Sequence, residues 1–382
     1  MIARGVPVVN PTAADVLPWG ADYGPQTLGG QYWRLLTAMF LHFGIIHILG
    51  NMWCLWSLGR LAEKLLDSIT VAGLYLLTGI GASLLSLSWD PMRVGAGASG
   101  AIFGIAGALI AVLHFGKLGL PAEAVKKLLG YVVRFALLNL LFGLEGHIDN
   151  MAHLGGLVTG LLMGFFIART FNGDNAERAV RRRLIIAFSA AIIVALTVYV
   201  VHAKQFAVEL GKALEALNQN HPAAAIPHLQ KYVAARPDDS YGHVLLGSAF
   251  QEAQRLDEAV PEFERALAIA PDSPALEVDL AKIYAYQKKT DKALALFKKA
   301  ISSAEPDNTA YYYYALALKD DGDLAEAEAQ ARRAVQLDPK GLHAHQLLAE
   351  ILSLEGKKSD AAAENKAIES LAAEDAKDQP AK

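Results

Sequence analysis

Long stretches with few charged side chains recur through the first half of the 382-residue chain and end near residue 204. Six of them approach the ~20 residues that an α-helix needs to cross a bilayer. They cover residues 45–66 (after an apolar run from 35), 69–88, 97–115, 128–145, 150–168 and 184–202. The fourth contains Arg134, which must pair or reach the membrane surface. The sequence therefore predicts an all-α polytopic membrane domain, in keeping with a positive mean hydropathy.

Lysine and arginine gather in alternate connections between these spans, and such connections face the cytoplasm. The residues concerned are Arg60 and Lys64, then Lys117, Lys126 and Lys127, then Arg169, Arg178, Arg181, Arg182 and Arg183. We therefore expect the chain before the first span and the chain after the sixth to lie outside the cytoplasm. With no targeting segment visible, a bacterial inner membrane is the expected location.

The net charge argues against a nucleic-acid-binding protein, and the cysteine count excludes a protein held together by disulfides. A net charge of −4 does not favour a nucleic-acid partner. The single Cys54 cannot form an internal disulfide and is expected to pack as a small apolar residue.

The second half of the chain repeats with a period near 34 residues. Pro237, Pro271, Pro306 and Pro339 mark the period, each beside an aspartate. Between the first two prolines, small and large residues alternate at Leu246, Gly247, Phe250, Ala259, Phe263 and Ala266, and similar sets follow. This pattern resembles a tetratricopeptide array. It predicts an α-solenoid over 206–372, with a degenerate unit at 206–237, a capping helix, a disordered tail at 373–382 and a peptide or protein ligand.

Polar residues inside the membrane half are the candidates for chemistry, because they are costly there. Gly97-Ala98-Ser99-Gly100 opens the third span. The glycines permit a sharp entry, and the start of a helix offers free amide donors. Taken alone, the motif is also typical of packing faces between membrane helices.

His153 supplies a base for Ser99, about one turn into the fifth span. Glycines spaced by four on both helices present small faces that allow a close crossing. They are Gly100 and Gly104 on one helix, and Gly156, Gly160 and Gly164 on the other. Such a crossing would bring imidazole and hydroxyl within hydrogen-bonding reach. The alternative is that His153 caps a helix or meets a backbone carbonyl.

A third group begins at His42 and includes His47 and Asn51, which share one helical face because they are four residues apart. Both side chains could donate hydrogen bonds to an oxyanion. A metal site of His42, His47 and His153 is the rival interpretation, but no His-Glu-x-x-His signature or intramembrane carboxylate at ligand spacing supports it. We therefore expect no metal and no cofactor.

Together these motifs resemble the rhomboid family of intramembrane serine proteases, over roughly residues 20–170. The resemblance also includes Trp33-Arg34 before the first span and Glu63 at its inner end. It implies Ser99 as nucleophile and His153 as general base and then acid. It further implies an oxyanion hole of the Ser99 amide, His47 and Asn51, with His42 in support. Trp33 and Arg34 would shape a loop beside the site, with Glu63 as a partner. The alternative for these three residues is anchoring at the membrane interface.

One departure concerns the helix that precedes the Trp-Arg loop in that family, since residues 1–30 contain no apolar span. We expect an in-frame upstream extension that supplies it. The predicted organisation is an outer segment at 1–34, a protease core at 35–170, a basic linker and additional span at 171–205, and the repeat domain.

Two functions from different classes remain at this point. The first is a protease that cleaves transmembrane segments near their extracytoplasmic end, with the repeats recruiting a protein. The second is a catalytically silent membrane adaptor whose working part is the repeat array.

Overall fold

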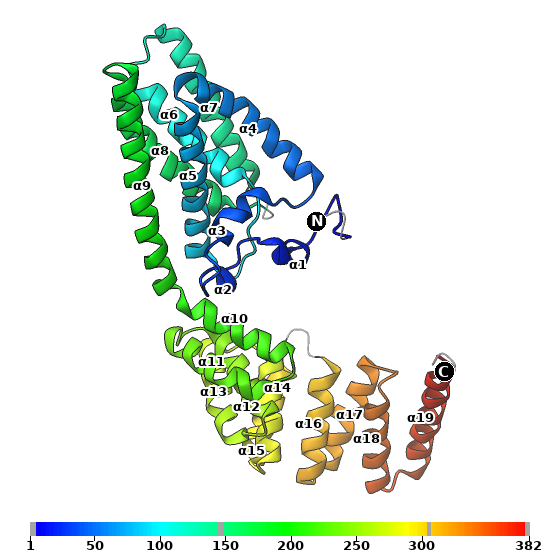
Figure 1. Ribbon diagram of the computed structural model, residues 1–382. Helices are drawn as coiled ribbons and strands as arrows, with labels where there is room; N and C mark the ends of the chain where they lie inside the picture. Colours follow the sequence, from blue (N-terminus) through cyan, green and yellow to red (C-terminus); the bar gives the residue numbers. More distant parts are fainter. Residues whose placement is uncertain (1–4, 144–147, 304–306, 379–382) are drawn as a thin grey trace. The chain divides into compact units, whose positions relative to one another are not determined.

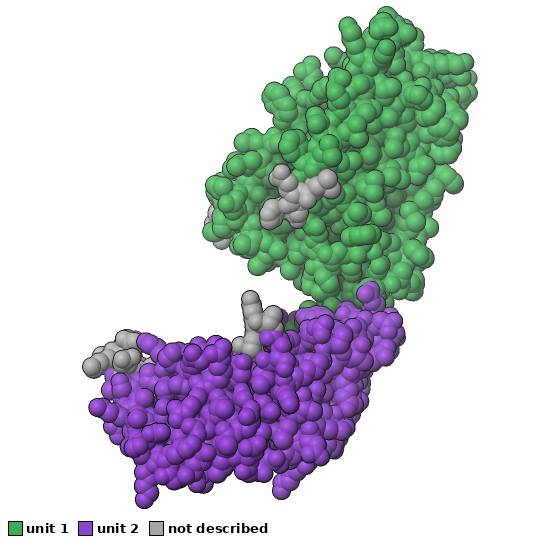
Figure 2. Space-filling model, turned by 180° about the vertical axis from the view of Figure 1, so that it is seen from behind, with its two compact units in different colours: residues 1–214 green, residues 215–382 purple. Residues whose placement is uncertain are grey.

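The computed structural model describes residues 5–143, 148–303 and 307–378. The chain divides into two compact units, Met1–Leu214 and Glu215–Lys382 (Figure 2). Each unit is described below by itself.

The first unit is helical, as predicted. Short helices precede the predicted spans: α1 (Ala13–Val16), η2 (Leu17–Trp19), α2 (Gly24–Thr27), α3 (Arg34–Thr37) and η3 (Ala38–Phe40). The longer helices are α4 (Ile45–Leu65), α5 (Ser68–Trp89), α6 (Ser99–Phe115), α7 (Ala122–Phe142), α8 (Asn150–Ala168) and α9 (Asn175–Ala203), with η5 (Arg169–Phe171) between the last two (Figure 1). Helix α10 (Gln205–Asn218) crosses the boundary between the units.

Helices occur at all six predicted spans, but not all of them have the length and composition of a full crossing. Among the described residues, three do: α5, α8 with η5, and α9. A fourth span results if the segments Arg34–Phe40 and Ile45–Leu65, bent by 94°, count as one. Helix α6 is apolar but only 17 residues long. Helix α7 begins before the predicted 128 and ends at Phe142, and residues 144 and 145 of that prediction lie outside the described residues.

The apolar run from residue 35 does not continue into α4 as one helix. The chain turns between η3 and α4 at Gly44, whose φ of +95° favours glycine. A Cβ there would also lie 2.0 Å from the backbone oxygen of Val9. The turn therefore separates a short helical loop from the α4 helix, which carries His47 and Asn51.

Helix α6 is the centre of the first unit. It packs against α4, α5, α7 and α8 (Figure 1), and large side chains such as Ile102, Ile105 and Leu109 are almost completely buried. Because α6 begins at Ser99, this central helix also positions the candidate nucleophile.

Helix α9 packs along α5. A Cβ on Gly73 of α5 would lie 2.8 Å from Ile186 of α9, so the two helices approach closely. At the other end of α9, Ile193 and Val200 join a core cluster with Leu84 of α5 and Val208 of α10. Helix α9 is thus part of the bundle.

The second unit consists of helix hairpins, and its solenoid of repeats was correctly predicted. Its helices are α11 (Pro222–Ala235), α12 (Ser240–Glu252), α13 (Leu256–Ile269), α14 (Pro274–Tyr286), α15 (Thr290–Ala300), α16 (Asn308–Asp321), α17 (Leu324–Leu337), α18 (Leu342–Leu354) and α19 (Lys358–Asp378). Of the prolines that mark the period, Pro306 lies outside the described residues. Residues 373–378, expected in a disordered tail, continue α19 because alanine, glutamate and lysine favour helix.

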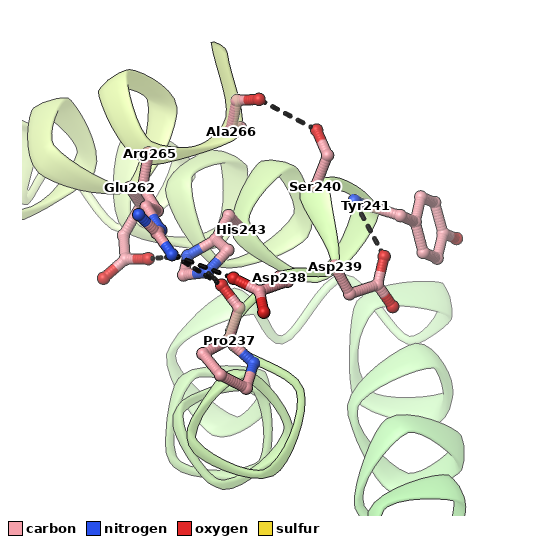
Figure 3. Close-up of polar contacts among 9 residues, drawn as sticks. All are labelled: Pro237, Asp238, Asp239, Ser240, Tyr241, His243, Glu262, Arg265 and Ala266. Carbon is pink, nitrogen blue, oxygen red and sulfur yellow. Dashed lines mark hydrogen bonds and ion pairs between the residues drawn. The ribbon is translucent and has the colours of Figure 1, made fainter. Parts of the chain in front are cut away.

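Small residues let the two helices of each repeat approach, as the pattern indicated. A Cβ on Gly247 of α12 would lie 2.8 Å from the ring of Phe263 on α13, and Phe263 is fully buried. Polar contacts add to this packing. His243 of α12 bonds the Glu262 carboxylate of α13 at 2.7 Å and the Pro237 carbonyl at 3.1 Å (Figure 3). The same arrangement recurs at His345, Glu364 and Pro339.

Candidate active site

Ser99 lies at the start of α6, directly after a glycine-rich approach. Gly97 has a φ of +143°, and its N–H donates to the Ala38 carbonyl at 2.9 Å. Two residues earlier, Gly95 exchanges both backbone hydrogen bonds with Asp22, each at 2.8 Å. Ser99 is the first residue of α6, so the helix itself offers its amide no acceptor. Backbone hydrogen bonds at Gly95 and Gly97 therefore hold the segment that leads into Ser99. The Ser99 N–H, at the start of the helix, is directed away from the helix body.

His47 and Asn51 of α4 lie beside Gly97. A Cβ on Gly97 would be 2.9 Å from His47 Cε1 and 3.8 Å from Asn51 Nδ2. The Phe43 N–H donates to His47 Nδ1 at 3.2 Å, which places the proton of the neutral ring on Nε2. Asn51 Nδ2 is buried and has no hydrogen-bond partner among the residues that the structure describes. Two donors are thus present next to the Ser99 segment.

His153 is held within the first turn of α8 and is 5% exposed. The backbone N–H of His153 donates to the Asp149 carbonyl at 3.1 Å. The imidazole ring stacks on the ring of Phe103 of α6, with 4.3 Å between the ring centroids. The Asp149 side chain accepts from Ala152 N at 2.9 Å and from Ser86 Oγ at 2.5 Å. His153 Nδ1 is buried, and no described residue forms a hydrogen bond with it. The imidazole is therefore fixed by a helix cap and a ring stack.

The crossing of α6 and α8 brings the serine and histidine segments together. A Cβ on Gly100 would lie 3.5 Å from the Ala152 oxygen, so the residue after Ser99 neighbours the residue before His153. A Cβ on Gly156 would be 1.9 Å from the Gly100 oxygen. One turn further, a Cβ on Gly160 would be 2.0 Å from the Gly104 oxygen. Only glycine permits this backbone approach.

The Trp-Arg loop is held by backbone carbonyls. Arg34 donates to the Leu17 carbonyl at 2.9 Å, to the Ala21 carbonyl at 2.8 Å and to Gln31 at 2.7 Å. Its guanidinium also lies 4.8 Å from the Trp33 ring, and Trp33 is half exposed.

The expected partner of this loop, Glu63, is not among the groups that Arg34 contacts. It lies exposed near the far end of α4, about four and a half helical turns from His47.

A small polar cavity of about 50 Å³ adjoins Ser99, with Asp22, Ser83, Ser86 and Asp149 in its lining. Its size suits a water molecule. Thr27 Oγ donates to Asp22 at 2.6 Å, and Asp22 is 4% exposed. Burial raises the pKa of the Asp22 carboxyl to about 6, with the neighbouring Asp149 adding to the rise.

His42 lies against His47, with ring centroids 5.2 Å apart and an edge-to-face geometry. Over the described ranges no three His, Cys, Asp or Glu side chains form a group that could hold a metal ion.

Three residues that the structure places in the site were not predicted from the sequence. Asp149 stands three residues before Ala152, the spacing of a helix N-cap, which could have revealed it. Phe103 is four residues after Ser99 and so on the same helical face. Asp22 carried no signal, since only the fold brings it to Gly95.

The features above define a helical membrane domain with a serine and a histidine at a glycine-lined helix crossing, followed by helix-hairpin repeats. Residues 29–170 match the protein family described as "Rhomboid domain", and residues 210–274, 250–319 and 309–340 match three tetratricopeptide-repeat families. The chain therefore carries a rhomboid domain followed by tetratricopeptide repeats, and both resemblances are confirmed. Rhomboid proteins are integral membrane proteins and generally serine proteases.

Curated relatives include proteins of a plant and of a bacterium. "RHOMBOID-like protein 6, mitochondrial" of Arabidopsis thaliana is 35% identical over 165 residues, which are 43% of this chain and 53% of the relative. "Rhomboid protease GluP" of Bacillus subtilis (strain 168) is 36% identical over 185 residues, which are 48% of this chain and 34% of the relative. The chain spans about half the length of such relatives or less. Among solved structures, "MamA 41-end from Desulfovibrio magneticus RS-1" is 22% identical, with 46% of this chain and 97% of that one covered and a TM-score of 0.43.

Proposed function

We propose that this chain is an intramembrane serine protease in which Ser99 is the nucleophile and His153 the general base. One observation carries the proposal: within the described part of the chain, buried Asn51 Nδ2 and His153 Nδ1 have no hydrogen-bond partner. Asn51 lies beside Gly97, and Ala152, the neighbour of His153, lies beside Gly100. Leaving a buried polar group unpaired costs about 1–3 kcal/mol. Such groups are retained where a reacting molecule will pair with them.

The proposed reaction begins with attack of Ser99 Oγ on a peptide carbonyl carbon, while His153 accepts the hydroxyl proton. The carbonyl oxygen becomes an oxyanion. It would accept hydrogen bonds from the Ser99 N–H, from His47 Nε2–H and from Asn51 Nδ2. His153 then donates its proton to the leaving amine as the C–N bond breaks. A water molecule, deprotonated by His153, hydrolyses the acyl-enzyme and restores Ser99.

The substrate class follows from the surroundings. A transmembrane helix buries its carbonyls in internal hydrogen bonds, so it must unwind before attack. Segments with glycine, proline or small residues near their end are therefore the expected substrates. The distribution of Lys and Arg supports cleavage near the extracytoplasmic end. The proposed location is a bacterial inner membrane.

The repeat domain is proposed to recruit a peptide or protein outside the cytoplasm. The residues of the candidate active site described above all lie within the first unit. Protease added to intact spheroplasts should therefore digest the repeats, whereas protection until lysis would reverse the proposed orientation.

Ser99→Ala and His153→Ala test the chemistry directly. We expect each to abolish cleavage of a helix-breaking transmembrane substrate in vesicles, without loss of membrane insertion. Wild type should also be labelled at Ser99 by a serine-directed covalent inhibitor. Full cleavage by Ser99→Ala would refute the protease. Absence of both cleavage and labelling in wild type would instead favour the silent adaptor.

Chain truncation tests the separation of roles. A chain that stops after Leu214 keeps Val208, which packs with Leu28 in the first unit. We expect it to cleave a generic substrate while losing selectivity for a recruited partner. A chain that stops after Lys204 loses Val208 as well and should be less stable. Loss of all cleavage in the longer, folded truncation would contradict the proposed division.

A further inference from the structure

An open cavity of about 510 Å³ lies where the α4–α5 turn meets the beginning of α9. Helix α5 is 22 residues long, so its two ends are about 33 Å apart at 1.5 Å per residue. Ser99 follows the far end of α5, and the cavity lies at its near end. Because ~30 Å is the hydrocarbon thickness of a bilayer, the cavity falls at the headgroup level opposite the candidate active site.

Positive charge dominates the lining of this cavity. Arg178, Arg182 and Arg183 line it, against a single carboxylate, Asp67. Arg182 Nη1 pairs with Asp67 at 3.3 Å, and its Nε donates to Thr170 Oγ at 3.2 Å. Burial raises the pKa of the Asp67 carboxyl, but hydrogen bonds from Thr70 and Arg182 lower it by more than burial raises it. The pKa of Asp67 is therefore below its usual range. One ion pair is therefore satisfied, and two arginine charges remain in excess.

Arg178 is the group that points to a ligand. Its Nε is buried and has no hydrogen-bond partner among the described residues. A buried guanidinium nitrogen left unpaired is costly, and an anion bound in the cavity would pair with it. Leucine, isoleucine and phenylalanine side chains from the α4–α5 turn and η5 supply an apolar lining beside the arginines.

We propose that this cavity binds the phosphate group of an anionic phospholipid at the membrane face opposite Ser99. Arginine binds phosphate through paired N–H donors, and basic pockets between membrane helices on the cytoplasmic side bind anionic headgroups. The apolar lining favours a lipid over free phosphate, because an acyl chain can cover it. A bound headgroup would link the α4–α5 turn to α9. The inference is independent of the proposed protease activity.

The test is lipid binding to the full chain in detergent, measured by native mass spectrometry with phosphatidylglycerol and with phosphatidylcholine. Wild type should retain phosphatidylglycerol preferentially. The double variant Arg178→Gln/Arg183→Gln should weaken that binding by about 30-fold, equivalent to ~1 kcal/mol for each basic residue. Arg182 is left in place because it holds Asp67 and Thr170.

Arg181→Gln is the matched control. Arg181 carries the same charge on the same helix but does not line the cavity, and it pairs with Glu177 at 3.3 Å. It should keep the wild-type preference. Equal retention of both lipids by wild type, with no effect of inorganic phosphate on the melting temperature, would overturn the proposal without any variant. Equal loss in the control and the double variant would overturn it too. Stabilisation by inorganic phosphate alone would support the phosphate site and identify free phosphate as its source.

Discussion

Replacement of Gly156 by alanine should separate the serine from the histidine. The added Cβ would lie 1.9 Å from the Gly100 backbone oxygen, and ordinary contacts begin near 3.4 Å. The oxygen belongs to the backbone of α6 and cannot rotate away, so the two helices must move apart by about 1.5 Å. Gly100 follows Ser99 directly, and Gly156 lies three residues after His153. The displacement therefore acts at the pair itself.

A misplacement of ~1 Å at a reacting group can lower a rate by about 10²-fold. We expect Gly156→Ala to lose at least that much, in cleavage of a transmembrane substrate and in the rate of covalent labelling at Ser99. Overpacking of this kind costs about 1–3 kcal/mol, so the variant should still fold with a lower melting temperature. Rates are to be normalised to the folded fraction.

Gly59→Ala on α4 is the control. Its Cβ would meet only Leu55 Cδ1, at 3.8 Å, which is an ordinary contact. Alanine is the better helix former by ~1 kcal/mol, so activity and stability should be unchanged or slightly raised. If Gly156→Ala matches Gly59→Ala in both rate and melting temperature, the close crossing of α6 and α8 does not position the pair.

Three further changes test other parts of the molecule. Asn51→Ala should lower the cleavage rate by about 10²–10³, as for one oxyanion donor, and an unchanged rate would exclude Asn51 from that role. Asp22→Asn should remove a pH dependence of the free energy of unfolding. Burial raises the pKa of Asp22 to about 6 from 3.8, so between these pH values the folded state keeps a proton that the unfolded chain loses. The stability of wild type should therefore fall as the pH rises from 3.8 to about 6. Melting temperatures that vary equally with pH in wild type and Asp22→Asn would contradict this. His243→Ala should destabilise the repeat domain by about 1–3 kcal/mol in thermal unfolding. His343 is exposed, so His343→Ala should leave the stability unchanged. Equal effects of the two variants would show that the contacts of His243 with Glu262 and Pro237 contribute nothing to stability.

Periodicity along the chain was sufficient to predict the repeats. The interface between helices of a hairpin is made by residues at fixed spacing, such as Ala259 and Phe263, and both are fully buried. Neighbouring hairpins contact one another in order along the chain, so local pattern and tertiary packing coincide. The same holds for the glycines of α6 and α8, whose spacing of four predicted a face that the structure places at the crossing.

Sequence alone did not determine how the membrane domain begins and closes. The start of the first span was predicted near residue 45, but not the 94° bend between the segment Arg34–Phe40 and α4. The sequence also indicated Glu63 as a partner of the Trp-Arg loop, whereas Arg34 bonds the Leu17 and Ala21 carbonyls. Backbone acceptors carry no side-chain signature, so this contact could not be predicted from residue types.

What the sequence by itself determined is therefore the helical class, the repeat array and the identity of Ser99, His153, His47 and Asn51 as candidates, because each depends on spacing within one helix or on residue type. Only the tertiary structure decided that Asp149 accepts a hydrogen bond from Ser86, that Asp22 reaches Gly95, and that Arg178 faces a cavity beside Asp67. These contacts join segments far apart in the chain. Their partners are set by how helices pack, and packing depends on the whole fold rather than on any local pattern.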